Sequence, residues 1–244
     1  MIEVTDHDGV AILSLSHGPV NALDLEILTE LPNALAQVAD ARAVVLTGAG
    51  RCFSAGVDLK RIIDGGAGYA RDFIPALSTA AFAWFTHPKP TVAAVNGHAL
   101  AGGCVLAAAA DVALMSGGTI GLTELAAGVP FPTVPLEIMR HACAAVSSLV
   151  LTAKTIGPAE AVAIGLVDRA VIPEELMAAA LAQAEKLATV RSEVYALSKK
   201  QVQQPAVHRI ESLRALDDPA VTDIWASEST RDFLVEFMAS LGRK

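Results

Sequence analysis

Residues 91–104 read TVAAVNGHALAGGC, and this stretch decides the fold. The segment Thr91 to Val95, entered through a Pro88-Lys89-Pro90 breaker, is typical of a strand that is buried on both faces. It leads through Asn96-Gly97-His98 into a helix of small residues from Gly102 to Ala110. A buried strand that passes into a helix indicates an α/β fold with crossover connections.

The segments on either side continue this alternation of strands and helices. An N-terminal hairpin is expected because Asp8-Gly9 supplies the positive φ of a tight turn between two apolar runs. Further strands are expected at residues 43–46, 111–115, 119–121 and 169–172. Helices are expected at residues 25–38, with a kink at Pro32, and at 158–165, 174–189, 192–204 and 227–241. The simplest division is an α/β core over residues 1–188 and a helical tail over residues 189–244.

The composition excludes several classes of protein. The 244 residues are 53% hydrophobic and 18% charged, which is typical of a globular chain and not of a disordered one. The formal net charge of −8 argues against a nucleic-acid partner. The most apolar stretch, Ala99 to Met115, contains Asp111 and is too short to cross a bilayer. Three cysteines without a CxxC pair, and an N-terminus unlike a signal peptide, predict a reduced, cytoplasmic protein.

Two motifs of other enzyme families are incomplete. The glycines of Gly48-Ala49-Gly50 follow a strand, but Phe53 occupies the third glycine position of a dinucleotide-binding loop. The stretch from Cys52 to Gly56 resembles a nucleophile elbow in which cysteine replaces the first glycine. None of the six histidines has metal-ligand spacing. The sequence therefore predicts neither a dinucleotide cofactor nor a metal ion.

Several segments, taken in their order and spacing, resemble the crotonase superfamily of enoyl-CoA hydratases and isomerases. They are NAL at residues 21–23, FSAGVDLK at 53–60, AVNGHALAGGC at 94–104, IGLTE at 120–124, and the 151–168 segment, which begins LT and ends GLVD. The resemblance covers the chain up to the helical tail. It implies a crotonase-like ββα spiral core and an acyl-CoA thioester as substrate. It also implies a homotrimer or a dimer of trimers, in which the tail serves oligomerisation.

The resemblance also implies an oxyanion hole. Its two donors would be the backbone N–H groups of Val57 and Gly102, each beside small residues that let a thioester approach the chain closely. The second donor opens a helix, whose N-terminus adds positive potential. Each segment alone is better explained as a turn or a helix–strand contact, whereas both together with Glu124 favour the functional interpretation.

Further residues are implied to contact coenzyme A, which enters as part of the substrate and not as a separate cofactor. These residues are Ala22, Ser54, Ala55, Gly56, Asp58, Leu59, Lys60 and Gly103. Lys60, with Lys199 or Lys200 in the tail, is a candidate partner for the phosphates, and a solvated surface lysine is an equally good interpretation. Asp58 also suits a helix N-cap, which requires no ligand. Pro19-Val20 replaces the basic residue that the family often carries before NAL, so one phosphate contact lacks its usual side chain.

Two positions bear on the reaction. Hydratases of the family add water with two glutamates, and the position two residues after the glycine pair is Val105 here. A valine can neither hold nor deprotonate water. The second glutamate is present as Glu124, and the aromatic-proline segment at residues 128–132 resembles the enoyl-CoA isomerases.

Glu124 is therefore predicted to be the catalytic base rather than a surface carboxylate at a helix start. Leu122, Leu125 and Val129 should desolvate it and raise its pKa toward a useful value. Five apolar residues fit either the acyl pocket or the core: Phe73, Ile74, Leu77, Phe82 and Phe131.

Three hypotheses follow for the function. The first is an isomerase of fatty-acid metabolism that converts a 3-enoyl-CoA into a 2-enoyl-CoA with Glu124 as its base. The second is an enoyl-CoA hydratase, a lyase of the same fold, in which unidentified groups hold the water. The third is a binding protein that has the acyl-CoA pocket and little catalysis.

Overall fold

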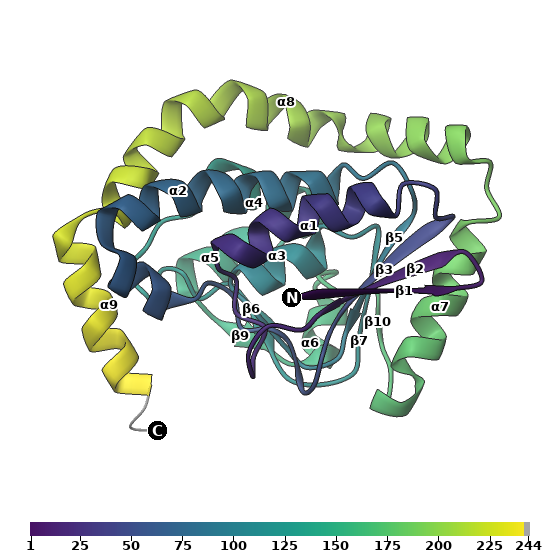
Figure 1. Ribbon diagram of the computed structural model, residues 1–244, viewed down its shortest axis with the longest axis horizontal. Coiled ribbons are helices and arrows are strands. Elements are labelled where there is room, and N and C mark those ends of the chain that lie inside the picture. The colour runs from purple at the N-terminus through teal and green to yellow at the C-terminus, as the bar shows by residue number, and fades with distance from the viewer. Residues whose placement is uncertain (242–244) are drawn as a thin grey trace.

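The computed structural model describes residues 1–241 and contains two sheets surrounded by helices (Figure 1). The larger sheet has the order β1-β2-β3-β5-β7-β10. Its strands are β1 (Ile2–His7), β2 (Val10–Leu15), β3 (Ala43–Gly48), β5 (Thr91–Val95), β7 (Val112–Met115) and β10 (Arg169–Ala170). The smaller sheet has the order β4-β6-β8-β9. Its strands are β4 (Cys52–Ser54), β6 (His98–Leu100), β8 (Ile120–Gly121) and β9 (Thr155–Ile156).

The strands of the larger sheet pair in the way that the turn and the buried apolar runs of the sequence predict. Strands β2, β3, β5, β7 and β10 run parallel, whereas β1 is antiparallel to β2. The β1–β2 hairpin turns at Asp8 and Gly9, whose φ angles are 50° and 81°, as predicted for this pair. Every residue of β3 and β5 is buried, because helices cover both faces of the sheet.

Two hydrophobic cores separate the helices into layers. Val44 and Leu46 of β3 belong to the larger core, beneath α1 to α4, whereas Val45 of the same strand faces α7. The first helices along the chain that contribute to the larger core are α1 (Leu25–Gln37), α2 (Leu59–Phe85), α3 (Gly102–Ala108) and α4 (Thr133–Ala142). Those that follow are α5 (Val146–Thr152), α6 (Pro158–Ala163), a 3₁₀ turn (Pro173–Glu175) and α7 (Leu176–Leu187).

The helical tail lies across the core. Helix α8 (Ser192–Trp225) packs against α4 and α2, and α9 (Glu228–Leu241) turns back to pack on α2 (Figure 1). Trp225 at the end of α8 is 3% exposed, and its indole N–H donates to the Pro130 carbonyl at 2.9 Å. The tail therefore reaches the core near the segment that follows Glu124.

The sequence located most strands but underestimated two helices. Helix α2, expected only at its start, runs on through a kink at Gly66, with φ 62°, and through Pro75. Helix α8, expected to end at residue 204, continues through Pro205 and Pro219. Helix α1 contains Pro32 without a break in the helix. Helices α4 and α5 were not expected at all, because packing in the core overrides weak local signals.

The predicted fold class is confirmed: an α/β arrangement with parallel sheets and C-terminal helices. The predicted tail ends with residues 242–244, which lie outside the described residues. Within residues 1–241, no helix combines the length and the apolar character needed to cross a membrane.

Candidate active site

Two backbone segments, residues 54–57 and 101–103, lie against one another. A Cβ on Gly56 would stand 2.5 Å from the Leu100 carbonyl oxygen and 3.3 Å from the Gly102 nitrogen. A Cβ on Gly103 would stand 2.4 Å from the Ser54 carbonyl oxygen. Both distances to oxygen are shorter than any side chain tolerates, so the two glycines permit the close approach. The structure thus brings together the two segments that the sequence singled out.

Each segment carries a backbone N–H group without a partner. Among the described residues, the amides of Val57 and Gly102 donate no hydrogen bond. Gly102 is the first residue of α3, where backbone donors have no acceptor within the helix. The preceding Ala101 has φ 50° and ψ −121°, a conformation that a residue with a side chain rarely adopts. Both amides are therefore available to a ligand.

Glu124 follows β8 and is 7% exposed. Its Oε2 atom is buried and has no hydrogen-bond partner. Burial raises the pKa of this carboxyl to about 8, against a smaller lowering by the backbone N–H groups of Thr123 and Glu124. Leu122 and Val129 are buried beside it as expected, whereas Leu125 is 40% exposed and does not contribute to the desolvation.

A cavity of about 50 Å³ lies beside Glu124. Its lining residues are Ala55, Val57, Leu59, Ala101, Thr123, Glu124, Ala127, Val129, Trp225 and Phe237. They come from the segment before α2, from the segments around α3 and β8, and from the tail. Glu124 is the one titratable side chain among these described lining residues. The cavity therefore joins the Val57 segment, the Ala101 segment and the carboxylate in one apolar space.

The sequence analysis did not identify the two tail residues that line this cavity. Trp225 and Phe237 are separated from Glu124 by more of the chain than any local pattern covers, so no motif connected them with the site. Of the five apolar residues that fitted either pocket or core, none lines the cavity. Phe73, for example, is fully buried and packs against Trp225 with ring centroids 6.2 Å apart.

The NAL segment, residues 21–23, fixes the position of the 54–57 segment through hydrogen bonds. Asn21 has φ 50°, and its side-chain amide donates to the carbonyls of Ala49 and Cys52 at 3.1 and 2.8 Å. Ser54 donates its hydroxyl to the Asn21 carbonyl at 2.7 Å and accepts the Gly56 N–H at 3.1 Å. These bonds occupy the Ser54 hydroxyl, which is fully buried.

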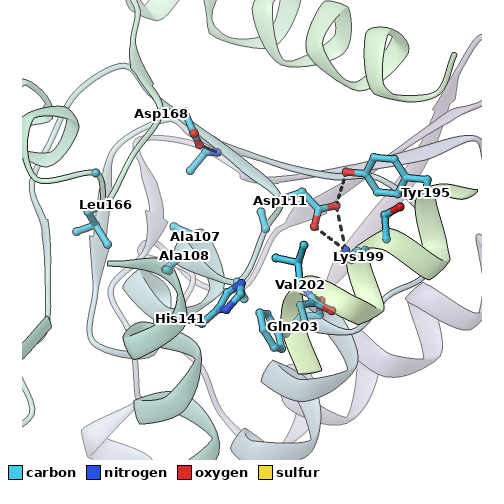
Figure 2. Close-up of a pocket in the computed structure, with 17 residues that line it drawn as sticks. Ala107, Ala108, Asp111, His141, Leu166, Asp168, Tyr195, Lys199, Val202 and Gln203 are labelled. Carbon is cyan, nitrogen blue, oxygen red and sulfur yellow. Dashed lines mark hydrogen bonds and ion pairs between the residues drawn. The ribbon is translucent and has the colours of Figure 1, made fainter. Parts of the chain in front are cut away.

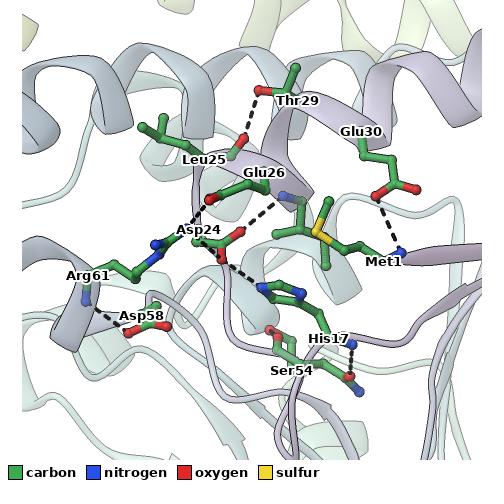
Figure 3. A network of polar contacts seen from close by, with 12 residues as sticks. Met1, His17, Asp24, Leu25, Glu26, Thr29, Glu30, Ser54, Asp58 and Arg61 are labelled. Atoms are coloured by element: carbon green, nitrogen blue, oxygen red, sulfur yellow. Dashed lines mark hydrogen bonds and ion pairs between the residues drawn. The ribbon is translucent and has the colours of Figure 1, made fainter.

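A polar network extends from this segment to the start of α2 (Figure 3). Asp24 caps α1 by accepting the Ile27 N–H at 3.0 Å, and its other oxygen lies 2.6 Å from Nε2 of His17. Arg61 pairs with Glu26 and lies 3.8 Å from Asp24. The network ties the N-terminus of α1 to the first turn of α2, which follows Val57 directly.

The structure places the residues implied to contact coenzyme A in different environments. Ala22, Ala55, Asp58 and Leu59 are half-buried, Ser54, Gly56 and Gly103 are buried, and Lys60 is exposed. Asp58 caps α2 by accepting the Arg61 N–H at 3.1 Å. Lys60 pairs with Asp64 one turn later. Only Ala55 and Leu59 of this set also line the cavity.

Lys199, a candidate phosphate partner, is not at the surface. Its side chain is 5% exposed, and Nζ lies 2.9 Å from Oδ1 of Asp111 (Figure 2). The Tyr195 hydroxyl donates to Asp111 at 3.0 Å, and the Lys199 ammonium also reaches Thr91 Oγ1 at 3.3 Å. These groups border a cavity of about 420 Å³, which Ala107 and Ala108 at the C-terminal end of α3 also line. Burial lowers the pKa of Lys199, while Asp111 opposes this shift.

Val105, at the position of the first hydratase glutamate, is 1% exposed in α3 and does not line the cavity. Within residues 1–241, no three histidine, cysteine, aspartate or glutamate side chains gather as a set that could hold a metal ion.

The parallel sheets, the paired glycine segments and the buried glutamate define a fold of the crotonase type. The family model for enoyl-CoA hydratase/isomerase matches residues 5–240, and the chain belongs to this family. A Thermus thermophilus relative is 40% identical over 152 residues, which span 60% of this chain and 60% of that protein. A Rhizobium meliloti protein named a probable enoyl-CoA hydratase is 31% identical over 90% of this chain and 87% of its own.

The fold also matches a crystal structure of human mitochondrial delta3-delta2-enoyl-CoA isomerase. The TM-score is 0.93, and the match covers 99% of this chain and 98% of the human chain at 24% identity. At this identity the likeness describes the fold alone. The chain is thus an enzyme of the hydratase/isomerase family, and the choice between the two reactions depends on the site.

Proposed function

We propose that this protein is an enoyl-CoA isomerase that converts 3-enoyl-CoA into 2-enoyl-CoA. The observation that supports this choice is the single carboxylate of the cavity: Glu124 is buried, its Oε2 has no hydrogen-bond partner, and no second titratable side chain lines the space in the described part of the chain. One base is sufficient to move a proton between two carbons of the same substrate, whereas the family's hydration uses two glutamates.

The proposed reaction begins at the thioester carbonyl. Its oxygen accepts hydrogen bonds from the amides of Val57 and Gly102, which act as an oxyanion hole. Glu124 removes a proton from C2, and the electron pair of that C–H bond delocalises into the carbonyl to form a dienolate. The carbonyl then re-forms, C2 and C3 become the double bond, and C4 takes the proton back from Glu124. One hydrogen has moved from C2 to C4, and no other reagent is consumed.

The environment of Glu124 suits this task. A base works best when its pKa lies near the working pH, and burial brings the Glu124 pKa to about 8. Apolar walls exclude water, which would otherwise stabilise the carboxylate and weaken it as a base. The partly positive N-terminus of α3 adds to the stabilisation of the enolate oxygen.

Hydration has less support from the same site. A bound water needs about two to four polar partners, and besides Glu124 the lining side chains offer only the Thr123 hydroxyl and the Trp225 indole N–H, which already donates to the Pro130 carbonyl. Val105 supplies no second carboxylate. Hydration nevertheless stays the second candidate, because the Rhizobium relative and further curated relatives carry hydratase names. A binding protein with little catalysis is the third, and the intact Glu124 argues against it.

The coenzyme A part of the substrate is proposed to lie along Ala22 and residues 54–60, with the exposed Lys60 near its phosphates. No separate cofactor is needed for this chemistry. The proposed setting is fatty-acid metabolism in the cytoplasm.

A homotrimer, or a dimer of trimers, is proposed for the assembly, because α8 presents large apolar side chains to solvent. Four of these exposed residues are Leu197, Val202, Leu216 and Ile224. Light scattering at micromolar concentration should give a trimeric or hexameric mass, and a monomer would contradict the proposal.

The experiment that separates the candidates uses two substrates. The protein is incubated with a 3-enoyl-CoA and, separately, with a 2-enoyl-CoA, and conjugation and hydration are followed. The proposal expects conversion of the first and little hydration of the second. Hydration of the 2-enoyl-CoA without isomerisation would identify a hydratase, and binding of both without conversion would identify a binding protein.

A further inference from the structure

We infer that the helical tail sets the acyl-chain length of the substrate, with Phe237 of α9 and Trp225 of α8 as the wall that limits the acyl group to a short chain. The inference rests on the proposed acyl-CoA substrate and concerns the same cavity. Because it concerns size and not chemistry, it applies equally to isomerisation and hydration.

The available space is small. The cavity beside Glu124 measures about 50 Å³. A protein cavity of about 150 Å³ holds one benzene ring of six carbons, so a space of about a third of that volume has no room for a long acyl chain. The thioester carbonyl and C2 must lie between the Val57 segment and Glu124, and the rest of the acyl group then meets the two aromatic rings.

Both rings are held in place within the chain itself. Trp225 is fixed by its hydrogen bond to the Pro130 carbonyl at 2.9 Å and by its contact with the Phe73 ring. Helix α9 is fastened by Leu234, which is fully buried, and by the Arg231 side chain, which donates to the Ile63 carbonyl at 2.9 Å. A longer acyl chain would have to displace this packed helix.

Helix α9 also provides a matched control residue. Phe233 lies one turn before Phe237, is 46% exposed and does not line the cavity. Both residues are phenylalanines on one helix, and only Phe237 faces the substrate space. Truncation of either ring removes similar apolar volume, so a difference between the two variants reports on the cavity.

The test measures binding of butyryl-, hexanoyl-, octanoyl- and decanoyl-CoA by calorimetry. These saturated thioesters cannot be isomerised or hydrated, so the readout is independent of the reaction. The parent protein should bind octanoyl-CoA at least about tenfold more weakly than butyryl-CoA. In Phe237→Ala, octanoyl-CoA should bind as tightly as butyryl-CoA or more tightly, because each accommodated methylene adds affinity. Phe233→Ala should keep the parent's order.

Several outcomes would overturn the inference. Equal or tighter binding of octanoyl-CoA by the parent would show that the tail does not limit the chain. An unchanged order in Phe237→Ala, with folding verified by circular dichroism, would assign the limit elsewhere. Should Phe237→Ala not fold, Phe237→Leu must shift the preferred length by a smaller amount. If the length order holds while 2-enoyl-CoA is hydrated, only the isomerase proposal fails.

Discussion

Glu124 and the Asp111–Lys199 pair are both ionisable groups removed from water, but only the second has its counter-charge. Lys199 is 5% exposed on its side chain and lies 2.9 Å from Asp111, which also accepts the Tyr195 hydroxyl. Glu124 is 7% exposed, and its Oε2 has no partner at all. The cavity beside the Asp111–Lys199 pair measures about 420 Å³, whereas the cavity beside Glu124 measures about 50 Å³.

The difference separates a structural site from the proposed reactive one. Lys199 joins α8 to the start of β7 through a pair whose hydrogen bonds are satisfied, and such a pair has no free group to offer a ligand. The Glu124 carboxylate has no counter-charge, and the backbone N–H groups of Glu124 and Thr123 offset only part of its desolvation cost, so its pKa is raised to about 8. Cavity size alone would point to the wrong place. The absence of a counter-charge identifies Glu124 as the candidate base.

The largest effect is expected from removing the unpaired carboxylate. Glu124→Gln keeps the shape of the side chain, so coenzyme A thioesters should still bind, while turnover of 3-enoyl-CoA should fall by about a hundred- to ten-thousandfold. Glu137→Gln is the control, since Glu137 is equally buried but is paired with Arg140 and Arg209. That variant should lose stability and keep its turnover per folded molecule. Parent-like single-turnover isomerisation by Glu124→Gln would rule out Glu124 as the base.

Removing half of the paired site should act on stability instead. Lys199→Met leaves Asp111 without its cation, and breaking one side of a buried pair costs about 3–5 kcal/mol. The free energy of unfolding in urea measures this loss, and Lys200→Met, at the exposed neighbouring position, should change it little. Equal stability of the two lysine variants would mean that the buried pair does not fasten α8.

A substitution at the proposed oxyanion donor Gly102 should also lower turnover. Gly102→Val displaces the backbone N–H and places a side chain where even a Cβ would stand 2.8 Å from Leu23 Cδ1. Loss of one oxyanion donor lowers turnover by about a hundredfold or more. Thioester turnover is compared with the thermal melting curve of the same variant. Near-normal activity in a folded variant would contradict the role of this amide.

The sequence was sufficient for the strands of the larger sheet and for the site segments, because their signals are local, whereas the short strands β4, β6 and β9 of the smaller sheet were not expected. β5 is a run of small and branched residues, and the close glycine contacts at Gly56 and Gly103 follow from motifs within a few residues. Glu124 could be singled out by its spacing from the glycine pair. These features depend on short windows of the chain.

The rest depends on contacts between distant residues. Lys199 is 88 residues from Asp111, and a lone lysine on a helix is ordinarily expected in solvent. Phe237 reaches the cavity only because α9 folds back on α2. Helix α2 continues through Gly66 and Pro75 because Phe73 and its neighbours are buried in the core. No local pattern contains this information.

The pH dependence of isomerisation tests the central claim most directly, because it requires no substitution. If the unpaired Glu124 carboxylate is the base, only its ionised form reacts, and burial has raised its pKa to about 8. The kcat/KM for 3-enoyl-CoA should therefore rise about tenfold per pH unit below this value, reach half its maximum near pH 8, and level off above it. A rate that is constant over about two pH units on either side of 8, or that falls as the pH rises, would contradict the account.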